Sequence, residues 1–159
     1  NFYPGYVSAE RARWDSDHAA EKARFNAPPY NGIYIGQPER AKAALDEWEK
    51  AHPAPTVTIA MVADHVDYIR KVAGVDCVGI GSDFDGIPVT PVGLESVDKY
   101  PALFEELARR GWSDADLAKV AGGNMLRVMR EAEAVAKRLQ AKEGPSHATI
   151  AALDGAAAK

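Results

Sequence analysis

Two carboxylates lie close together where an apolar run of the sequence ends. Asp83 and Asp85 follow residues 75–81, whose β-branched side chains and bounding glycines predict a buried strand. Residues 81–88, Gly-Ser-Asp-Phe-Asp-Gly-Ile-Pro, then have the composition of a loop. Ligands and catalytic groups of α/β folds collect at this edge of a sheet. Paired carboxylates at such an edge can transfer protons or hold a cation.

Two kinds of chemistry fit this pair. In one, Asp83 is the strand-end carboxylate of a hydrolytic barrel and serves a metal-bound water as base or proton shuttle. In the other, Asp83 is the nucleophile of an aspartyl-phosphate phosphotransferase, with Mg²⁺ between Asp83 and Asp85. The second chemistry also needs a lysine and a downstream acidic pair, but the capping pattern of a helix start already explains Asp114 and Asp116. An acidic turn with a purely structural role is the remaining interpretation.

Composition and charge exclude several classes of protein. The 159 residues are 47% hydrophobic and 26% charged, which is ordinary for a globular protein with one core. The net charge of −4 and the lack of a basic run argue against a nucleic-acid partner. No apolar run approaches the roughly 20 residues of a membrane span. Cys77, the single cysteine, excludes an intrachain disulfide, and its place in the apolar strand predicts a packing role.

Helical patterns lie on both sides of the predicted strand. They cover residues 9–25, 38–51, 56–73 and 98–110, and two more begin at Ser113 and Asn124. Ser8 and Asn124 are the predicted N-caps of their helices, and Gly74 is a predicted helix end. Met125 and Met129 share the apolar face of the last helix, which predicts that they fill the core. A helix–strand–helix order predicts an α/β fold with a parallel sheet covered by helices.

The histidines and the opening tyrosines have structural explanations as well as functional ones. His18 is near carboxylates that could share a metal, but a solvated helix face explains it. His52 is expected to be a cation at a helix C-terminus, and His65 a buried, hydrogen-bonded structural residue, since Ile69 occupies the i+4 position. Residues 1–8 predict a strand end and a Pro-Gly turn, where Tyr6 either lines a pocket or covers the core.

Several runs of this sequence together resemble the membrane (renal) dipeptidase family of zinc peptidases. They are residues 1–3, Tyr6 and Ser8, Val62–Ile69, Ala73–Gly74, Val78–Gly86, Gly93–Leu94, Lys99–Pro101, Gly111–Trp112 and Asn124–Val128. The resemblance covers residues 1–8 and about 57–137. The segment 9–56 looks like a helical insertion of the kind that bacterial members carry, and residues 141–159 are expected to form a loosely held tail.

The resemblance implies the C-terminal portion of a single-domain (β/α)₈ TIM barrel of the metal-dependent amidohydrolase type. A barrel needs about 250 residues, so this chain would begin at the end of strand seven, with residues 75–81 as strand eight. None of the family's zinc ligands maps onto this chain. The two Zn²⁺ ions would therefore be held upstream, and without upstream ligands the chain would be a non-catalytic barrel fragment. The start, Asn1-Phe2-Tyr3, looks like the middle of an element, which leaves a bacterial cytoplasmic and an exported location both open.

The resemblance also implies roles for individual residues. Asp83 matches the family's acid beside the bridging water, which is implicated in proton transfer and in contact with the substrate amine. Tyr6 matches a tyrosine that lines the substrate pocket. Asp85 matches the motif without a catalytic role and is expected to organise the loop. The implied function is zinc-dependent hydrolysis of dipeptides together with the remainder of the barrel, which is compatible with a homodimer. The sequence leaves the D/L preference and any β-lactam activity open.

Overall fold

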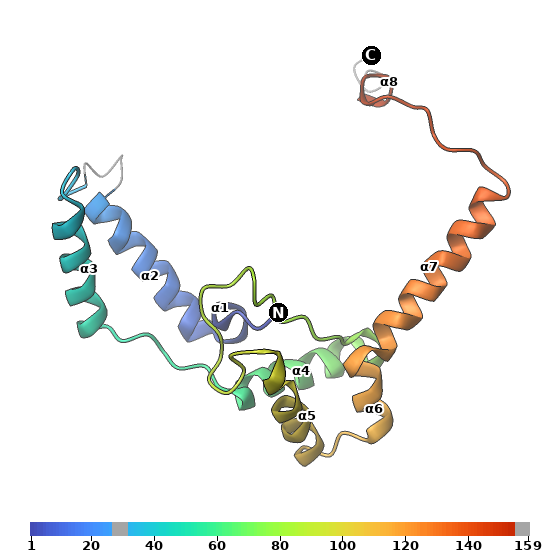
Figure 1. Ribbon diagram of the computed structural model, residues 1–159, viewed down its shortest axis with the longest axis horizontal. Coiled ribbons are helices and arrows are strands. Elements are labelled where there is room, and N and C mark those ends of the chain that lie inside the picture. Colours follow the sequence, from blue (N-terminus) through green and yellow to red (C-terminus); the bar gives the residue numbers. More distant parts are fainter. Residues whose placement is uncertain (27–31, 155–159) are drawn as a thin grey trace.

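The computed structural model of this chain describes residues 1–26 and 32–154. This part of the chain has a compact body, from which a helical hairpin and a long helix extend in different directions (Figure 1). The helices are α1 (Pro4–Val7), α2 (Ala9–Asn26), α3 (Pro38–Ala51), α4 (Ile59–Ala73), α5 (Tyr100–Arg109), α6 (Asp114–Ala118), α7 (Asn124–Gln140) and α8 (Ile150–Asp154). Single 3₁₀ turns cover Val75–Cys77 and Val97–Lys99, and a wide turn over Lys119–Gly123 joins α6 to α7.

Local end signals place several helix boundaries where the sequence predicts them. Pro38 occupies the start of α3, and Gly74, with φ 87°, ends α4. The Ser8 hydroxyl accepts a hydrogen bond from the Arg11 N–H at 3.2 Å, and the Ser113 hydroxyl accepts one from the Asp116 N–H at 3.2 Å. These bonds satisfy amides that the first turn of a helix leaves unpaired.

The hydrophobic core lies in the body, between α4, α5 and the segment that carries Asp83. Its buried members are Phe2, Val62, Ala63, Val66, Val78, Leu94, Leu103, Leu107, Trp112 and Val120. Val62 and Val66 recur at helical spacing on α4 and face Leu103 and Leu107 of α5 in this cluster. The core therefore holds the start of the chain and residues 75–94 against the same two helices.

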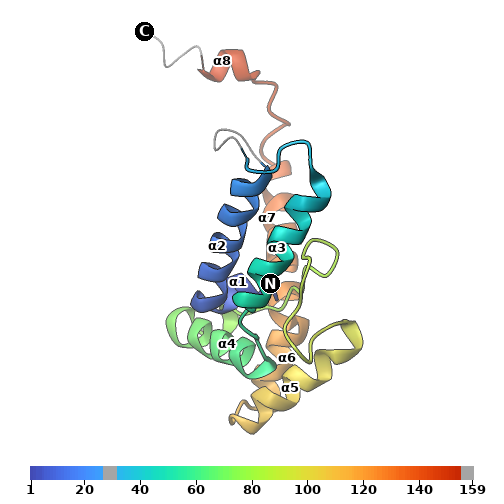
Figure 2. The same cartoon turned by 90° about the vertical axis from the view of Figure 1, so that its left-hand side faces the viewer.

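The hairpin of α2 and α3 stands apart from this core. Figure 2 shows the two helices side by side. Phe25 and Ala41 are the buried hydrophobic residues of these two helices. The hairpin is therefore a thin layer, as its weakly apolar sequence predicts.

The predicted sheet is not formed by the described residues. Residues 75–81 make one 3₁₀ turn and then an extended stretch, and the described chain holds a single isolated parallel bridge, between Thr58 and Val92. A strand needs hydrogen-bonded neighbours, and none is available here. The prediction of a strand buried along its whole length fails as well, because Val78 is buried but its neighbour Cys77, in the 3₁₀ turn, is exposed. The predicted packing role of Cys77 is therefore wrong.

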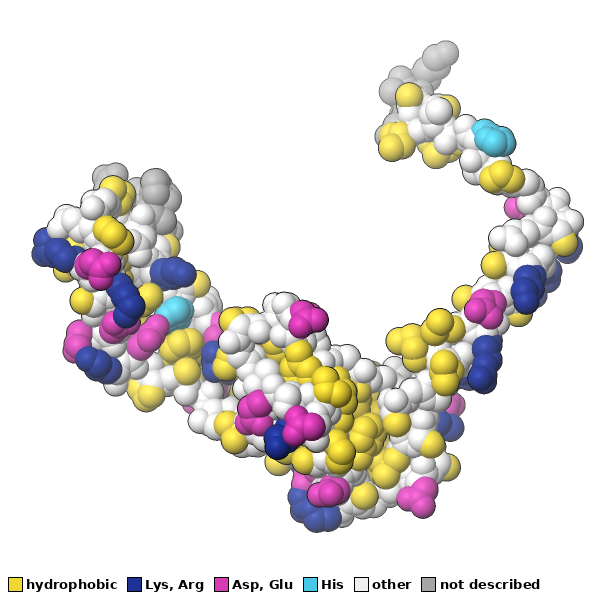
Figure 3. Space-filling model, in the orientation of Figure 1, with side chains coloured by type: hydrophobic (Ala, Val, Ile, Leu, Met, Phe, Trp, Pro, Cys, Tyr) yellow, Lys and Arg dark blue, Asp and Glu magenta, His cyan; other side chains and the backbone are white. Residues whose placement is uncertain are grey.

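Three further predictions are corrected by the packing. Residues 4–7 form the short helix α1 rather than a strand end with a turn. His65 is exposed on α4 and makes no hydrogen bond within the described residues. Met125 and Met129 are 62% and 53% exposed. They are exposed because α7 contacts the body at its first turn and then runs away from it, and Figure 3 shows hydrophobic side chains on the surface of this helix.

Candidate functional site

Asp83 lies in a tight turn whose shape depends on its own backbone. It is the one described non-glycine residue with a positive φ, at 63°. Its carbonyl oxygen accepts hydrogen bonds from the Gly86 N–H at 2.9 Å and the Ile87 N–H at 3.1 Å. A Cβ atom at Gly86 would collide with the Asp83 carboxylate, so a larger residue there would displace this carboxylate. The turn thus holds the exposed carboxylate over its own backbone.

The first residues of the chain hold the Asp83 carboxylate from the other side. The Asn1 side-chain amide donates a hydrogen bond to Asp83 Oδ2 at 2.8 Å. Asn1 Oδ1 accepts the Tyr3 N–H at 2.7 Å, so the amide has one orientation in which both bonds form. The Phe2 N–H donates to the Ser82 carbonyl at 3.2 Å. Residues far apart in the sequence therefore combine to orient one carboxylate.

Tyr6 and Asp85 are both exposed, but neither is hydrogen-bonded to Asp83 within the described residues. The Tyr6 side chain is 67% exposed, and its ring packs edge-on against the Tyr3 ring at 5.2 Å. Asp85 accepts no hydrogen bond from the described part of the chain. The turn is closed by the Asp83 carbonyl, so the loop-organising role predicted for Asp85 is wrong.

Asn124 supports the segment that leads to Asp83. Its side chain is 7% exposed, and Nδ2 donates to the Val75 carbonyl at 2.7 Å and to the Val78 carbonyl at 2.8 Å. The sequence predicts Asn124 as an N-cap, but it is the first residue of α7 and Gly123 is the cap. Asn124 therefore satisfies two backbone carbonyls of the segment that leads to Asp83.

Charged side chains of the wide turn and of α7 add to this support. Arg127 donates to the Asp76 carbonyl at 2.8 Å, and Lys119 forms an ion pair with the Asp76 carboxylate at 2.8 Å. The Lys119 ammonium lowers the pKa of Asp76. Asp116, which a phosphotransferase would use beside its nucleophile, pairs instead with Arg70 of α4 at 2.6 Å.

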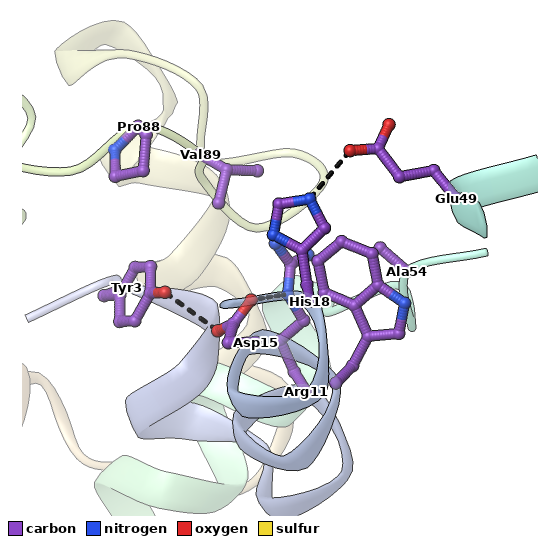
Figure 4. A pocket seen from close by; sticks show the side chains of 9 residues that line it. Tyr3, Arg11, Asp15, His18, Glu49, Ala54, Pro88 and Val89 are labelled. Atoms are coloured by element: carbon purple, nitrogen blue, oxygen red, sulfur yellow. Dashed lines mark hydrogen bonds and ion pairs between the residues drawn. The ribbon is translucent and has the colours of Figure 1, made fainter. Parts of the chain in front are cut away.

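A cavity of about 410 Å³ opens next to the Tyr3 ring (Figure 4). Its lining comes from α2, the end of α3, the linker to α4 and the loop after Asp83: Tyr3, Arg11, Trp14, Asp15, His18, Glu49, Ala54, Pro88 and Val89. The Tyr3 hydroxyl and Arg11 Nε each donate to Asp15, both at 2.8 Å. The hydrogen bond to Asp15 raises the pKa of Tyr3.

Sequence reasoning missed this cavity. Residues 11, 14, 15 and 18 share one face of α2, and this spacing was the available signal. The partners on the other side of the cavity could not be found in this way. Glu49 belongs to α3, and its carboxylate lies 2.8 Å from His18 Nε2. Pro88 and Val89 belong to the loop after Asp83.

The described residues provide no metal centre of their own. Among them, no group of three or more His, Cys, Asp and Glu side chains could hold a metal ion. The two zinc ions implied by the resemblance therefore do not fit this part of the protein alone. No described helix is both long and apolar enough to cross a membrane.

Comparison with known proteins identifies the family. The model of the membrane dipeptidases (Peptidase family M19) matches residues 1–143. Dipeptidase aclJ of Aspergillus oryzae is 47% identical over 93 residues, which are 58% of this chain and 22% of the relative. Dipeptidase 3 of Rattus norvegicus is 49% identical over 80 residues, 50% of this chain and 16% of the relative. Dipeptidase 3 of Macaca fascicularis is 48% identical over 84 residues, 53% of this chain and 17% of the relative. The chain thus spans about a fifth of the length of these relatives. Since the family model covers most of its length, the chain belongs to the membrane dipeptidase family.

Proposed function

We propose that this chain is the C-terminal part of a dipeptidase and that the intact protein hydrolyses dipeptides. The family match and the relatives' names as dipeptidases support this reaction. In this proposal the chain completes a (β/α)₈ barrel: residues 75–81 supply its last strand, and residues 9–56 are an insertion in it. The extended backbone at Val78 and the exposed glycines after it are compatible with pairing to strands that other parts of the protein supply.

Asp83 is the proton carrier of the proposed reaction. Peptide hydrolysis requires a proton to leave the attacking water and to reach the departing amine, and a carboxylate can perform both transfers. The observation that supports this role is the hydrogen bond from the Asn1 amide to Asp83 Oδ2 at 2.8 Å. It holds an exposed carboxylate in one orientation, and positioning of this kind is what a proton-transfer group requires.

The zinc ions and the substrate pocket of the proposal depend on residues outside this chain. We expect the ligands of both Zn²⁺ ions there, because the described residues hold no ligand cluster. Tyr6 is the residue of this chain that we expect to line the substrate pocket, since its exposed ring lies beside the Tyr3 ring at the start of the chain. Nothing in the site favours the phosphotransferase alternative, since Asp116 of its second acidic pair forms an ion pair with Arg70.

Replacing Asp83 by Asn in the intact zinc-loaded protein tests this proposal. Asparagine tolerates the positive φ of this position and preserves the shape of the side chain, so the fold and the zinc content should remain. The kcat for dipeptides should fall by about 10²–10⁴-fold, because an amide cannot take up and return the proton.

Asp85→Asn is the matched control, because Asp85 is exposed two residues away and bonds to nothing in the described chain. It should change kcat by less than about threefold, as surface substitutions do. Near-normal turnover by a zinc-loaded Asp83→Asn protein, or a larger effect of the Asp85 change, would contradict the assignment. An unchanged protein that hydrolyses no dipeptide with zinc bound would contradict the proposed function itself.

A further inference from the structure

The cavity beside Tyr3 has one flat aromatic wall. The His18 ring is stacked on the Trp14 ring, with 4.9 Å between centroids and 11° between planes. Figure 4 shows the His18 ring in the middle of the lining, with Pro88 and Val89 from the loop after Asp83 on the other side of the space. A parallel ring pair that faces proline and valine forms a slot suited to a flat or branched apolar group.

The charged groups in the cavity are already paired with one another. Asp15 accepts the Tyr3 hydroxyl on one oxygen and Arg11 Nε on the other. Glu49 is bonded to His18. A ligand in this cavity would therefore be held chiefly by shape and by contact with ring faces, because the carboxylates are already engaged.

Two connections link the cavity to the turn that carries Asp83. Asn1, which binds the Asp83 carboxylate, also binds the backbone of Tyr3, and the Tyr3 side chain lines the cavity. Pro88 and Val89 follow the Asp83 turn directly in the sequence. The Tyr6 ring packs against the Tyr3 ring, so the residue expected to line the substrate pocket contacts a residue that lines the cavity.

We propose that this cavity is a specificity subsite that receives a large apolar or aromatic side chain of the dipeptide. This inference rests on the proposed function and deepens it. A volume of about 410 Å³ is ample for such a side chain. The wall that gives the subsite its aromatic character comes from α2, so the hairpin decides which side chains the protein prefers while the body carries the reacting carboxylate.

Filling the slot tests the proposal. Val89→Trp in the intact zinc-loaded protein places a bulky ring where the side chain of the dipeptide would lie. The kcat/KM values for Ala-Phe, Phe-Ala and Ala-Ala are then compared. The ratio of kcat/KM for one of the two phenylalanine dipeptides to that for Ala-Ala should fall about tenfold or more, within the range that lost side-chain contacts produce. The loss should appear mainly as a higher KM, because the subsite contacts the side chain in the ground state and in the transition state alike.

Val92→Trp is the matched control, because Val92 lies in the same loop, is 59% exposed and does not line the cavity. This control should leave the kcat/KM ratios of Ala-Phe to Ala-Ala and of Phe-Ala to Ala-Ala within about twofold of those of the unchanged protein. His18→Ala, which removes the ring facing the slot, should lower the same ratio as Val89→Trp. The subsite would be overturned if Val89→Trp lowered kcat/KM equally for Ala-Ala and for both phenylalanine dipeptides. It would also be overturned if both Val89→Trp and His18→Ala left the two kcat/KM ratios unchanged.

A binding measurement separates failure of the subsite from failure of the proposed function. The Kd values of Ala-Phe, Phe-Ala and Ala-Ala are measured by calorimetry on the intact protein and on Val89→Trp. The subsite predicts that Val89→Trp weakens the binding of one of the two phenylalanine dipeptides about tenfold relative to Ala-Ala, namely the one whose kcat/KM falls. Equal Kd changes for all three dipeptides would overturn the subsite even in a protein with normal dipeptidase activity.

Discussion

The α2–α3 hairpin and the body around α4 and α5 are held together in different ways. In the body, Ala63, Leu94, Leu103 and Leu107 have no exposed surface at all. In the hairpin, rings stack in a row at the surface, with Trp48 packed between Trp14 and His52. Its ion pairs, such as Lys42–Asp46 and Lys50–Glu47, lie at the surface as well. Burial of apolar surface dominates the stability of a fold, and exposed ion pairs add little.

This difference shows how the two regions divide their roles. The body determines where Asp83 lies, because its core includes Phe2 and Val78, which belong to the two segments that meet at the turn. The hairpin adds a wall to the cavity without sharing that core. A change in the hairpin should therefore alter selectivity, and a change in the body should alter stability.

The largest expected difference between the regions comes from deleting a core side chain. Leu103→Ala should lower the free energy of unfolding by about 2–5 kcal/mol, because it leaves a cavity in a fully buried site. Leu45→Ala in α3 should cost clearly less, since Leu45 is only partly buried. Denaturant unfolding of the intact protein and both variants measures this. Equal losses would mean that the hairpin is as tightly packed as the body.

A smaller loss of unfolding free energy is expected when the hydrogen bonds of Asn124 to the segment before Asp83 are removed. Asn124→Ala leaves the Val75 and Val78 carbonyls without their donor, which should cost about 1–3 kcal/mol. Gln140→Ala, an exposed amide at the other end of α7, should change stability by less than about 0.5 kcal/mol. Hydrogen exchange of residues 78–82 should speed up only in the Asn124 variant. Unchanged exchange there would remove Asn124 from the support of the site.

Shortening the hairpin should affect the body still less. Removal of residues 12–52 with a short linker should leave the zinc content of the intact protein unchanged, because surface insertions are tolerated well. The preference for phenylalanine dipeptides over Ala-Ala should disappear with the cavity wall. Zinc content by metal analysis and kcat/KM for both dipeptides test this. Loss of zinc would show that the hairpin supports the site rather than its selectivity.

The smallest effect concerns the bond between the two regions. The hydrogen bond to Asp15 raises the pKa of Tyr3, so the protonated phenol is favoured in the folded protein. The stability that this hydrogen bond contributes is fully present below the pKa of Tyr3 in the unfolded chain, which is about 10. It is lost as the pH rises through the higher pKa of Tyr3 in the folded protein. Tyr3→Phe should therefore cost about 1 kcal/mol at pH 8 and less at pH 11. Denaturant unfolding at both values, with Tyr6→Phe as the control, measures the difference. A constant cost at both pH values would contradict this role of the bond.

The sequence by itself determined the longer helices and several of their ends, although it missed α1 and the cap of α7. Pro38, Gly74 and Ser113 act within a turn or two of their own positions, so local patterns predicted them correctly. The resemblance to dipeptidases also pointed to Asp83, because a sequence motif can be matched without knowing which residues surround it in the folded protein. The family prediction is confirmed by the match over residues 1–143, and the roles of Asp83 and Tyr6 remain predictions.

Tertiary structure decided the rest, because the deciding contacts join distant residues. Residues 75–81 have a strand-like composition, but a strand exists only with neighbours, and the described chain supplies none beyond one isolated bridge elsewhere. Asn124 looks like a cap and instead binds carbonyls 46 and 49 positions away. The Asn1–Asp83 bond spans 82 positions and the His18–Glu49 bond spans 31. No local pattern encodes contacts of that length, since they form only once the core has brought the segments together.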